Sequence, residues 1–255
     1  MRIYGDTKEL MTETGRNLYE MGLLNAPKTY QNKAIEGNPE FITKELICTQ
    51  YSLSLKNLHS IEDFSPLFIF DPNSKEWADR EFEERISSNP VNPGEAWKFR
   101  EGVWAEFLNE EGEFDYTYNQ RMNFVDPNAL SRASYLSYII KLLNEDRNTR
   151  KAVLSIFSPS DYVNFDGKRR IPCSMYYNFL IREDAYGTPR LDILYHQRSS
   201  DFVTHFGNDV YLAAKLNFYI AEQTGVLPGR LIHTIDSLHV YHKDWDALRV
   251  SLGKI

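Results

Sequence analysis

The sequence predicts a single α+β domain that spans residues 1–255. Two stretches with apolar residues at helical spacing indicate long helices, from Asp126 to about Asp146 and from Asn208 to Gly225. Short runs rich in β-branched and aromatic residues indicate strands, at Ala152–Phe157, Ser174–Ile181, Arg190–Gln197 and Leu231–Tyr241. Several strands among long helices, without internal repeats or a flexible linker, favour one α+β unit.

Local signals support the bounds of the two helices. Asp126 is a suitable N-cap for the first helix, with Pro127 in its first turn. The apolar residues of that helix recur at helical spacing, at Leu136, Ile139, Ile140 and Leu143. Gly225 is the stop signal of the second helix, whose apolar face is formed by Leu212, Leu216 and Ile220. The first third of the chain is predicted to be irregular, apart from a helix over Phe41–Leu55.

The composition excludes several classes of protein. Hydrophobic residues make up 42% and charged residues 25% of the chain, as in ordinary globular proteins. The formal net charge of -7 argues against binding nucleic acid or an anionic membrane through a basic face. We expect neither a signal peptide nor a membrane span, because long apolar runs are missing. The 2 cysteines form neither a disulfide framework nor a four-thiolate zinc site, so a reducing, cytoplasmic location is expected.

Cys173 is the candidate nucleophile. It lies in the segment Arg169–Ser174 between two predicted strands, where neighbouring guanidinium groups would lower the pKa of the thiol and enlarge the thiolate fraction. The competing interpretation is a buried, unreactive cysteine, and the statistics of cysteine burial alone favour it. The choice between a nucleophilic and an unreactive cysteine therefore depends on other segments of the sequence.

Two later segments offer groups that suit a nucleotide. Arg198 can bind phosphate oxygens with its planar guanidinium, and Ser199 with its hydroxyl. His239 and Tyr241 lie two residues apart in a predicted strand and so share one face, which suits two donors to one sugar. Taken singly, each of these four residues fits equally well as a polar residue whose hydrogen bonds are made to its neighbours. No metal is expected, because His239 and His242 lie in a strand pattern and no further ligands cluster there.

Together these segments resemble the thymidylate synthase superfamily, and within it most of all the deoxycytidylate (dCMP) hydroxymethylases. The matching motifs are the nucleophile Pro172-Cys173, the phosphate-binding strand Gln197–Asp201, the helix end Ala221–Gly229 and the sugar-binding pair His239 and Tyr241. The resemblance is strongest from Arg150 to Tyr241 and continues more weakly back to Glu45. It implies a large mixed β-sheet flanked by helices, which packs against its partner in a homodimer.

The resemblance also implies roles for residues outside these motifs. Glu45 is similar to the family's glutamate that organises water and proton transfer, and Tyr118 to a tyrosine near the nucleophile. Trp104 falls where a tryptophan packs on the folate, and Asp201 where an aspartate binds its pterin ring. The implied co-substrate is 5,10-methylenetetrahydrofolate.

Basic residues elsewhere are implied to complete the phosphate site. Arg150 and Lys151 resemble a paired-arginine segment that reaches across the dimer to the partner's phosphate, with lysine in place of the second arginine. A phosphate ligand from the N-terminal region is less clear, with Lys28 as the first candidate and Arg16 as another.

Asp209 departs from the thymidylate synthases, which have asparagine at this position and bind uracil. A carboxylate only accepts hydrogen bonds, so it repels O4 of uracil but accepts from the N4 amino group of cytosine. A place near a helix N-terminus favours the ionised form. The same replacement is typical of the dCMP hydroxymethylases, and Asn208 beside it is expected to contact the substrate. The competing interpretation is that Asp209 only caps the helix.

The resemblance implies a reaction that begins with addition of Cys173 to C6 of the pyrimidine. That addition makes C5 nucleophilic towards the one-carbon unit, and an exocyclic methylene results. Water then gives a hydroxymethyl group, whereas hydride gives a methyl group. The chain end Ser251–Ile255 shows no clear equivalent of the tail that closes over folate in the family, which favours water. A CMP hydroxymethylase, an atypical thymidylate synthase and a non-catalytic nucleotide-binding relative are the alternatives.

Overall fold

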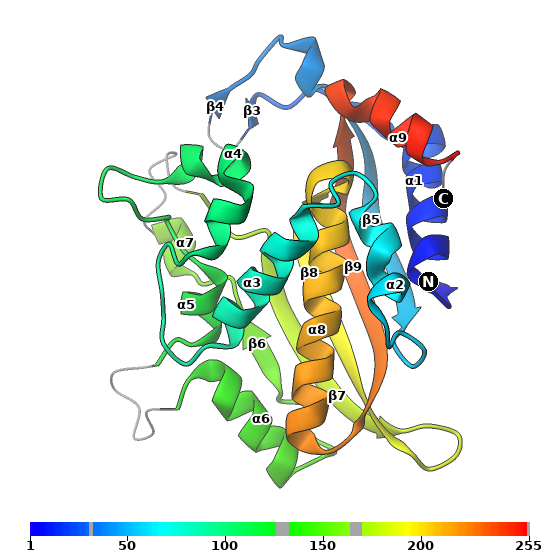
Figure 1. The fold of residues 1–255 in the computed structure, drawn as a ribbon, viewed down its shortest axis with the longest axis vertical. Helices are drawn as coiled ribbons and strands as arrows, with labels where there is room; N and C mark the ends of the chain where they lie inside the picture. Colours follow the sequence, from blue (N-terminus) through cyan, green and yellow to red (C-terminus); the bar gives the residue numbers. More distant parts are fainter. Residues whose placement is uncertain (31–32, 126–132, 164–169, 254–255) are drawn as a thin grey trace.

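A mixed sheet forms the centre of the molecule (Figure 1). The computed structural model describes residues 1–30, 33–125, 133–163 and 170–253. The 7-stranded sheet has the order β1-β5-β9-β8-β7-β6, with β2 paired to β5, and β3 pairs with β4 in a separate 2-stranded sheet. The strands are β1 (Arg2–Tyr4), β2 (Leu23–Asn25), β3 (Thr29–Tyr30), β4 (Lys33–Ala34), β5 (Thr43–Ser54), β6 (Val153–Ser155), β7 (Ser174–Glu183), β8 (Pro189–Asp201) and β9 (Leu227–Tyr241). This architecture confirms the predicted α+β fold with a large mixed sheet.

Helices cover one face of the sheet. The long helix α8 packs on β8 and β9, α3 packs on α8, and α1 packs on β5 (Figure 1). The helices are α1 (Thr7–Met21), α2 (Ile61–Phe64), α3 (Ser74–Ile86), α4 (Glu101–Trp104), α5 (Tyr118–Met122), α6 (Tyr135–Glu145), α7 (Ser160–Val163), α8 (Gly207–Thr224) and α9 (Trp245–Ser251). Within the described ranges, no helix is both long enough and apolar enough to cross a membrane.

Two glycines fix the position of α8. Gly225 ends the helix in the left-handed conformation, with φ of 64°, as its stop signal predicts. Gly207 begins it, where a Cβ atom would collide with the backbone carbonyl oxygen of Leu67. The missing side chain therefore lets the N-terminus of α8 approach the Ser65–Phe68 turn closely. This close approach sets where the first residues of the helix, Asn208 and Asp209, lie relative to the sheet.

The second half of the chain follows its sequence pattern closely. The strands predicted at Ser174–Ile181, Arg190–Gln197 and Leu231–Tyr241 correspond to β7, β8 and β9, which are longer than predicted by 2, 5 and 4 residues. The helix predicted to end near Asp146 ends at Glu145, with Asp146 as its C-cap. Its predicted start at Asp126 and Pro127 lies outside the described residues, and the described helix begins at Tyr135 behind the N-cap Ser134.

The helix predicted over Phe41–Leu55 is wrong. Residues Thr43–Ser54 form β5, which pairs antiparallel with β9 along nearly its whole length and parallel with β1. Tyr51, Ser52 and Leu53 are fully buried there between two neighbouring strands. Elsewhere on the strand Ile47 is 63% exposed, and the mixture of polar and apolar residues shows no regular alternation that would separate a strand from a helix.

The prediction of an irregular first third is also wrong, because α1 and α3 form there. Asp6 caps α1, its side chain accepting a hydrogen bond from the backbone N–H of Glu9. Leu10, Met11 and Leu18 then bury one face of that helix. Few apolar residues mark these helices, and their stability comes from packing against the sheet and α8 rather than from a strong local pattern.

Candidate active site

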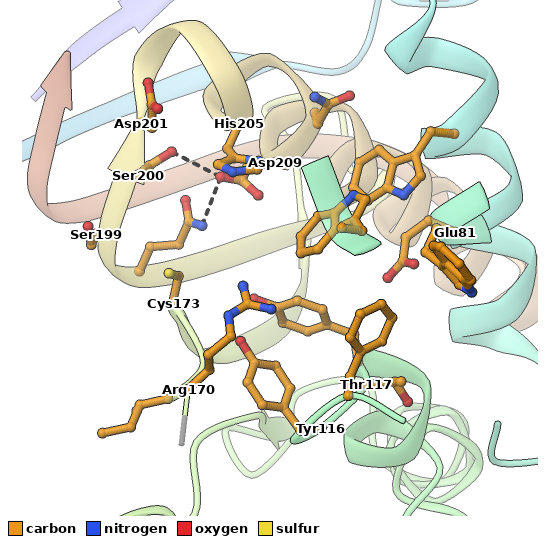
Figure 2. A pocket seen from close by; sticks show the side chains of 18 of the residues that line it. Glu81, Tyr116, Thr117, Arg170, Cys173, Ser199, Ser200, Asp201, His205 and Asp209 are labelled. Carbon is orange, nitrogen blue, oxygen red and sulfur yellow. Dashed lines mark hydrogen bonds between the residues drawn. The ribbon is translucent and has the colours of Figure 1, made fainter. Parts of the chain in front are cut away.

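A cavity of about 350 Å³ lies beside the end of β8 and the start of α8 (Figure 2). It brings together the predicted residues Tyr118, Cys173, Arg198, Ser199, Asp201, Asn208, Asp209, Trp104, His239 and Tyr241. These residues come from five separate parts of the chain, so only the fold assembles them. Lys28, Glu45, Arg150 and Lys151 do not line it.

Cys173 lies immediately before β7 and is tied to β8 by Arg198. The backbone N–H of Arg198 donates to the Cys173 carbonyl at 2.9 Å. The Arg198 side chain donates from Nε to the carbonyl of Pro172 at 2.9 Å and from Nη2 to that of Ile171 at 2.8 Å. The thiol is free and partly buried, and its sulfur faces the cavity in Figure 2. Arg198 thus holds the segment Ile171–Cys173 in place, while its charge lies beside the Cys173 sulfur.

The expected enlargement of the thiolate fraction does not hold for this structure. Burial raises the pKa of the Cys173 thiol above its usual value, and the negative charge of Asp209 adds to the rise. Arg198 and Arg170 act in the opposite direction but do not cancel it. Desolvation outweighs the guanidinium groups, so the thiol is protonated at neutral pH before a substrate binds.

Asp209 lies in the first turn of α8 and points to β8. Its Oδ2 accepts hydrogen bonds from Gln197 Nε2 at 3.0 Å and from Ser200 Oγ at 2.9 Å (Figure 2). Burial raises the pKa of this carboxyl to about 6, against the hydrogen bonds and the charge of Arg85, which lower it. The helix N-terminus therefore does not keep the pKa low as the sequence suggested, although the carboxylate still predominates at pH 7.

A buried polar chain lies across the cavity, on α3 and α5. Glu81 accepts a hydrogen bond from Arg85 Nε at 2.8 Å, and the Arg85 guanidinium lies 4.1 Å from the ring centre of Tyr118. Ser174 Oγ, next to the nucleophile, donates to the Tyr118 hydroxyl at 3.2 Å. Burial raises the pKa of Glu81 and of Tyr118. The chain thus connects a carboxyl with a raised pKa to the immediate neighbour of Cys173.

The structure does not bring Glu45 to the cavity. Glu45 lies on β5 opposite His239, and its carboxylate accepts a hydrogen bond from Ser237. Glu81 lines the cavity instead and was missed by the sequence analysis. The available signal was a Glu–Arg pair four residues apart on a helix that also buries Trp77 and Phe82.

The predicted sugar-binding pair lies side by side on β9. The rings of His239 and Tyr241 are 5.2 Å apart, edge to face, and both line the cavity. Ser199 follows Arg198 on β8 and also lines the cavity. The hydroxyl, guanidinium, imidazole and phenol thus surround one region, as the sequence predicted for a nucleotide.

The remaining predicted cations lie elsewhere. Lys28 is exposed and pairs with Glu36 at 3.3 Å, and Arg16 is exposed on α1. Arg150 and Lys151 are exposed just before β6, at the edge of the sheet. None of the four reaches the cavity of its own chain in the described residues.

Aromatic residues form the wall of the cavity near the predicted folate contacts. Trp104 stacks on Trp77 with ring centres 5.7 Å apart, and Trp97 and Phe114 line the same side. Asp201 Oδ1 accepts from the backbone N–H groups of Val203 at 3.1 Å and Thr204 at 3.3 Å, which caps the π-helical turn η5 (Phe202–Phe206). In the part of the chain that is described, His, Cys, Asp and Glu side chains form no group suited to a metal ion.

Comparisons with known proteins identify the family of the chain. Residues 96–254 match the family model described as "Thymidylate synthase". A protein of Methanococcoides burtonii is 29% identical over 165 residues, which cover 63% of this chain and 70% of that protein. Proteins of Methanosarcina mazei (33% over 135 residues, 52% of this chain and 56% of that protein) and Methanocaldococcus jannaschii (32% over 139 residues, 53% and 60%) are also similar. All three bear the name "Putative thymidylate synthase", and the match spans little more than half the length of the last two. With its family model covering most of the sequence, the chain belongs to the thymidylate synthase family.

Proposed function

We propose that this protein is a dCMP hydroxymethylase, which transfers a one-carbon unit from 5,10-methylenetetrahydrofolate to C5 of dCMP. Membership of the thymidylate synthase family supports a one-carbon transferase that takes this folate as co-substrate. The single observation that carries the choice of cytosine is the Asp209 carboxylate, which faces the same cavity as Cys173.

The hydrogen bonds of Asp209 leave one oxygen for the base. Gln197 and Ser200 both donate to Oδ2, so Oδ1 is the oxygen available to a ligand. An anionic oxygen accepts from the N4 amino group of cytosine and repels O4 of uracil. A helix-capping role alone does not account for Asp209, because its oxygen bonds two side chains of β8 rather than the backbone N–H groups of α8.

The chain's own groups suit the covalent route. The Cys173 thiol gives up its proton to solvent, and the thiolate then adds to C6 and makes C5 an enamine carbon, which attacks the carbon unit that the folate supplies. Arg198 and Ser199 bind the phosphate, and His239 and Tyr241 bind the sugar. Glu81 replaces Glu45 in our account as the carboxyl that moves protons, because it lines the cavity and burial raises its pKa, so that it holds a proton more readily than an exposed carboxyl does.

The aromatic wall fits a flat, partly reduced pterin. Trp97 and Trp104 line the cavity, and the indole N–H of each is buried without a hydrogen-bond partner among the described residues. Asp201 and Trp104 are the residues that would contact the folate. An enclosed apolar wall with a few unsatisfied donors is typical of a ligand site.

The direct test is turnover with methylenetetrahydrofolate and dCMP, CMP or dUMP in separate reactions, with products identified by mass. We expect 5-hydroxymethyl-dCMP as the main product. The names of the relatives favour a second candidate function, methyl transfer to dUMP. A methylated uracil product would support that function and contradict our proposal. If the enzyme turns over CMP in preference to dCMP, only the assignment of the sugar as deoxyribose would change.

The selectivity for cytosine should depend on pH. Burial raises the pKa of Asp209 to about 6, so the carboxyl gains a proton as the pH falls through that value. A protonated carboxyl can donate to O4 of uracil, so the kcat/KM ratio of dCMP to dUMP should fall, by at most about tenfold per pH unit because one proton is involved. In Asp209→Asn the ratio should not vary over this range. A wild-type ratio that stays constant from pH 8 to pH 5 would remove the ionisation of Asp209 from the account.

We further propose a homodimer in which Arg150 and Lys151 reach the phosphate site of the partner. On the face of the sheet opposite α8, Leu194 and Ile232 are half-buried and adjacent in register, and Tyr176 is 39% exposed. An apolar sheet face of this kind suits contact with a second copy. The exposure of both basic residues at the sheet edge fits a role in the other subunit's site.

Mixing two inactive variants tests the shared site. Cys173→Ser lacks the nucleophile, and the double variant Arg150→Ala/Lys151→Ala lacks the basic pair. After subunit exchange at equal amounts, about one site in four should combine both intact parts, which gives about a quarter of wild-type activity. Native mass spectrometry would confirm that mixed dimers form. Mixed dimers without any regain of activity would contradict the proposal that the pair acts across the interface.

A further inference from the structure

Two polar residues on one turn of helix form a part of the cavity wall that the proposed reaction has not yet used. His205 is the penultimate residue of the π-helical turn η5, and Asn208 is in the first turn of α8, three residues later. Residues three apart in a helix lie on the same side, and both line the cavity. Figure 2 shows the His205 ring projecting into the cavity from the turn above Asp209.

Asn208 has an unsatisfied acceptor at this position. Its side chain is only 5% exposed, and Nδ2 donates to the backbone carbonyl of Thr204 at 3.3 Å. Its Oδ1 is buried without a partner within the described residues. A buried amide oxygen is costly to leave without a hydrogen bond, so it indicates a ligand group or a bound water in the working enzyme.

His205 provides a neutral imidazole beside it. The ring centre lies 5.9 Å from that of Trp104, and neither ring nitrogen bonds to a group in the described parts of the chain. Burial is the main influence on its pKa, which it lowers to about 4. The charges of Arg100, Arg170 and His239 lower it further, against the opposing effect of Asp201. At neutral pH the ring therefore has one N–H donor and one free lone pair.

Trp104 adds a third polar atom to this part of the wall. Its indole Nε1 is buried without a partner among the described residues. A tightly held water molecule normally makes about three hydrogen bonds to protein groups. The imidazole, the Asn208 oxygen and the indole N–H supply both acceptors and a donor, which suits water better than an ion or an apolar group.

We propose that His205, together with Asn208, holds the water molecule that adds to the exocyclic methylene carbon of the nucleotide. This inference rests on the proposed hydroxymethylase function. The water oxygen bonds to the methylene carbon, and its proton passes to the lone pair of His205. The electron pair of the C5–methylene double bond moves to C5, then forms the C5–C6 double bond as the C6–sulfur bond breaks and Cys173 leaves as thiolate. His205 returns the proton to solvent, so no oxidant or reductant is needed.

The experiment measures how the methylene intermediate is divided between water and a competing thiol. Wild type, His205→Phe and His205→Gln are incubated with dCMP tritiated at C5, methylenetetrahydrofolate and 2-mercaptoethanol. Release of tritium counts the molecules that lose the C5 proton, a step that precedes the fate of the methylene carbon, and mass spectrometry gives the ratio of hydroxymethyl product to thioether product. His59→Phe, on an exposed loop residue, is the matched control for exchanging an imidazole for a phenyl ring.

We expect His205→Phe to keep most of the tritium release while the ratio falls about tenfold or more, as one lost hydrogen bond in the transition state implies. His205→Gln should restore most of the ratio because its amide can again hold water. His59→Phe should behave as wild type.

Two results would overturn the inference. One is an unchanged ratio in His205→Phe. The other is a raised KM for the folate with the ratio unchanged, which would place the ring against the pterin. Failure of the proposed function is a separate result, because wild type itself would then form no hydroxymethyl product.

Discussion

Cys173→Ser is expected to abolish both hydroxymethylation of dCMP and exchange of its C5 proton. The serine hydroxyl has nearly the same size, so the Arg198 bonds to the loop carbonyls remain. Its oxygen is a far weaker nucleophile at neutral pH than a thiolate, so the base never gains a nucleophilic C5. The loss should be on the order of 10⁴-fold or more, as for other enzymes without their covalent nucleophile.

The control for this change is Cys48→Ser. Cys48 is the other free cysteine, exposed on β5 and outside the cavity. This variant should retain wild-type exchange and turnover. Tritium release from C5 measures the exchange without depending on the final product. Exchange that survives in Cys173→Ser would assign the nucleophile to another group and remove the covalent route.

Asp209→Asn is expected to transfer the preference from dCMP to dUMP. The amide oxygen takes the place of Oδ2 and accepts from Gln197 and Ser200, so the amide nitrogen takes the place of Oδ1 and faces the base. That nitrogen donates to O4 of uracil but meets the N4 amino group of cytosine as donor against donor. We expect the ratio of kcat/KM values to change by a factor on the order of 10³, since a mispaired buried polar group is costly.

A charge-matched control separates this effect from a general loss of negative charge. Asp246→Asn removes one charge on α9, where the side chain is 93% exposed. Its selectivity should equal that of wild type. Selectivity for cytosine that persists in Asp209→Asn would leave Asp209 as a helix-capping residue and return the choice of base to other groups.

Most of the predicted site residues lie together in the structure, whereas parts of the predicted secondary structure are wrong. Cys173, Arg198, Asp209, His239 and Tyr241 each lie in or next to a strand or helix whose pattern is strong, and the structure brings all five to one cavity. These five positions can be recognised in short sequence motifs, because the chemistry requires particular side chains whatever the surrounding residues are.

The misplaced glutamate shows what a sequence pattern does not contain. Glu45 and Glu81 are both acidic residues near apolar ones, and only the packing of α3 against α8 brings Glu81 to the cavity. The raised pKa of Cys173 is a similar case, since neighbouring arginines are visible in the sequence but the extent of burial is not. Both depend on long-range packing, as does the strand β5 that local periodicity presents as a helix.

Turnover of dCMP in water enriched in oxygen-18 shows whether water adds to the methylene carbon. We expect a 5-hydroxymethyl-dCMP whose new hydroxyl group carries the heavy isotope. Mass spectrometry of the isolated nucleotide, with fragments that separate base from sugar phosphate, would locate the label. A methylated product, or a hydroxymethyl group without the isotope, would rule out hydroxymethylation by water.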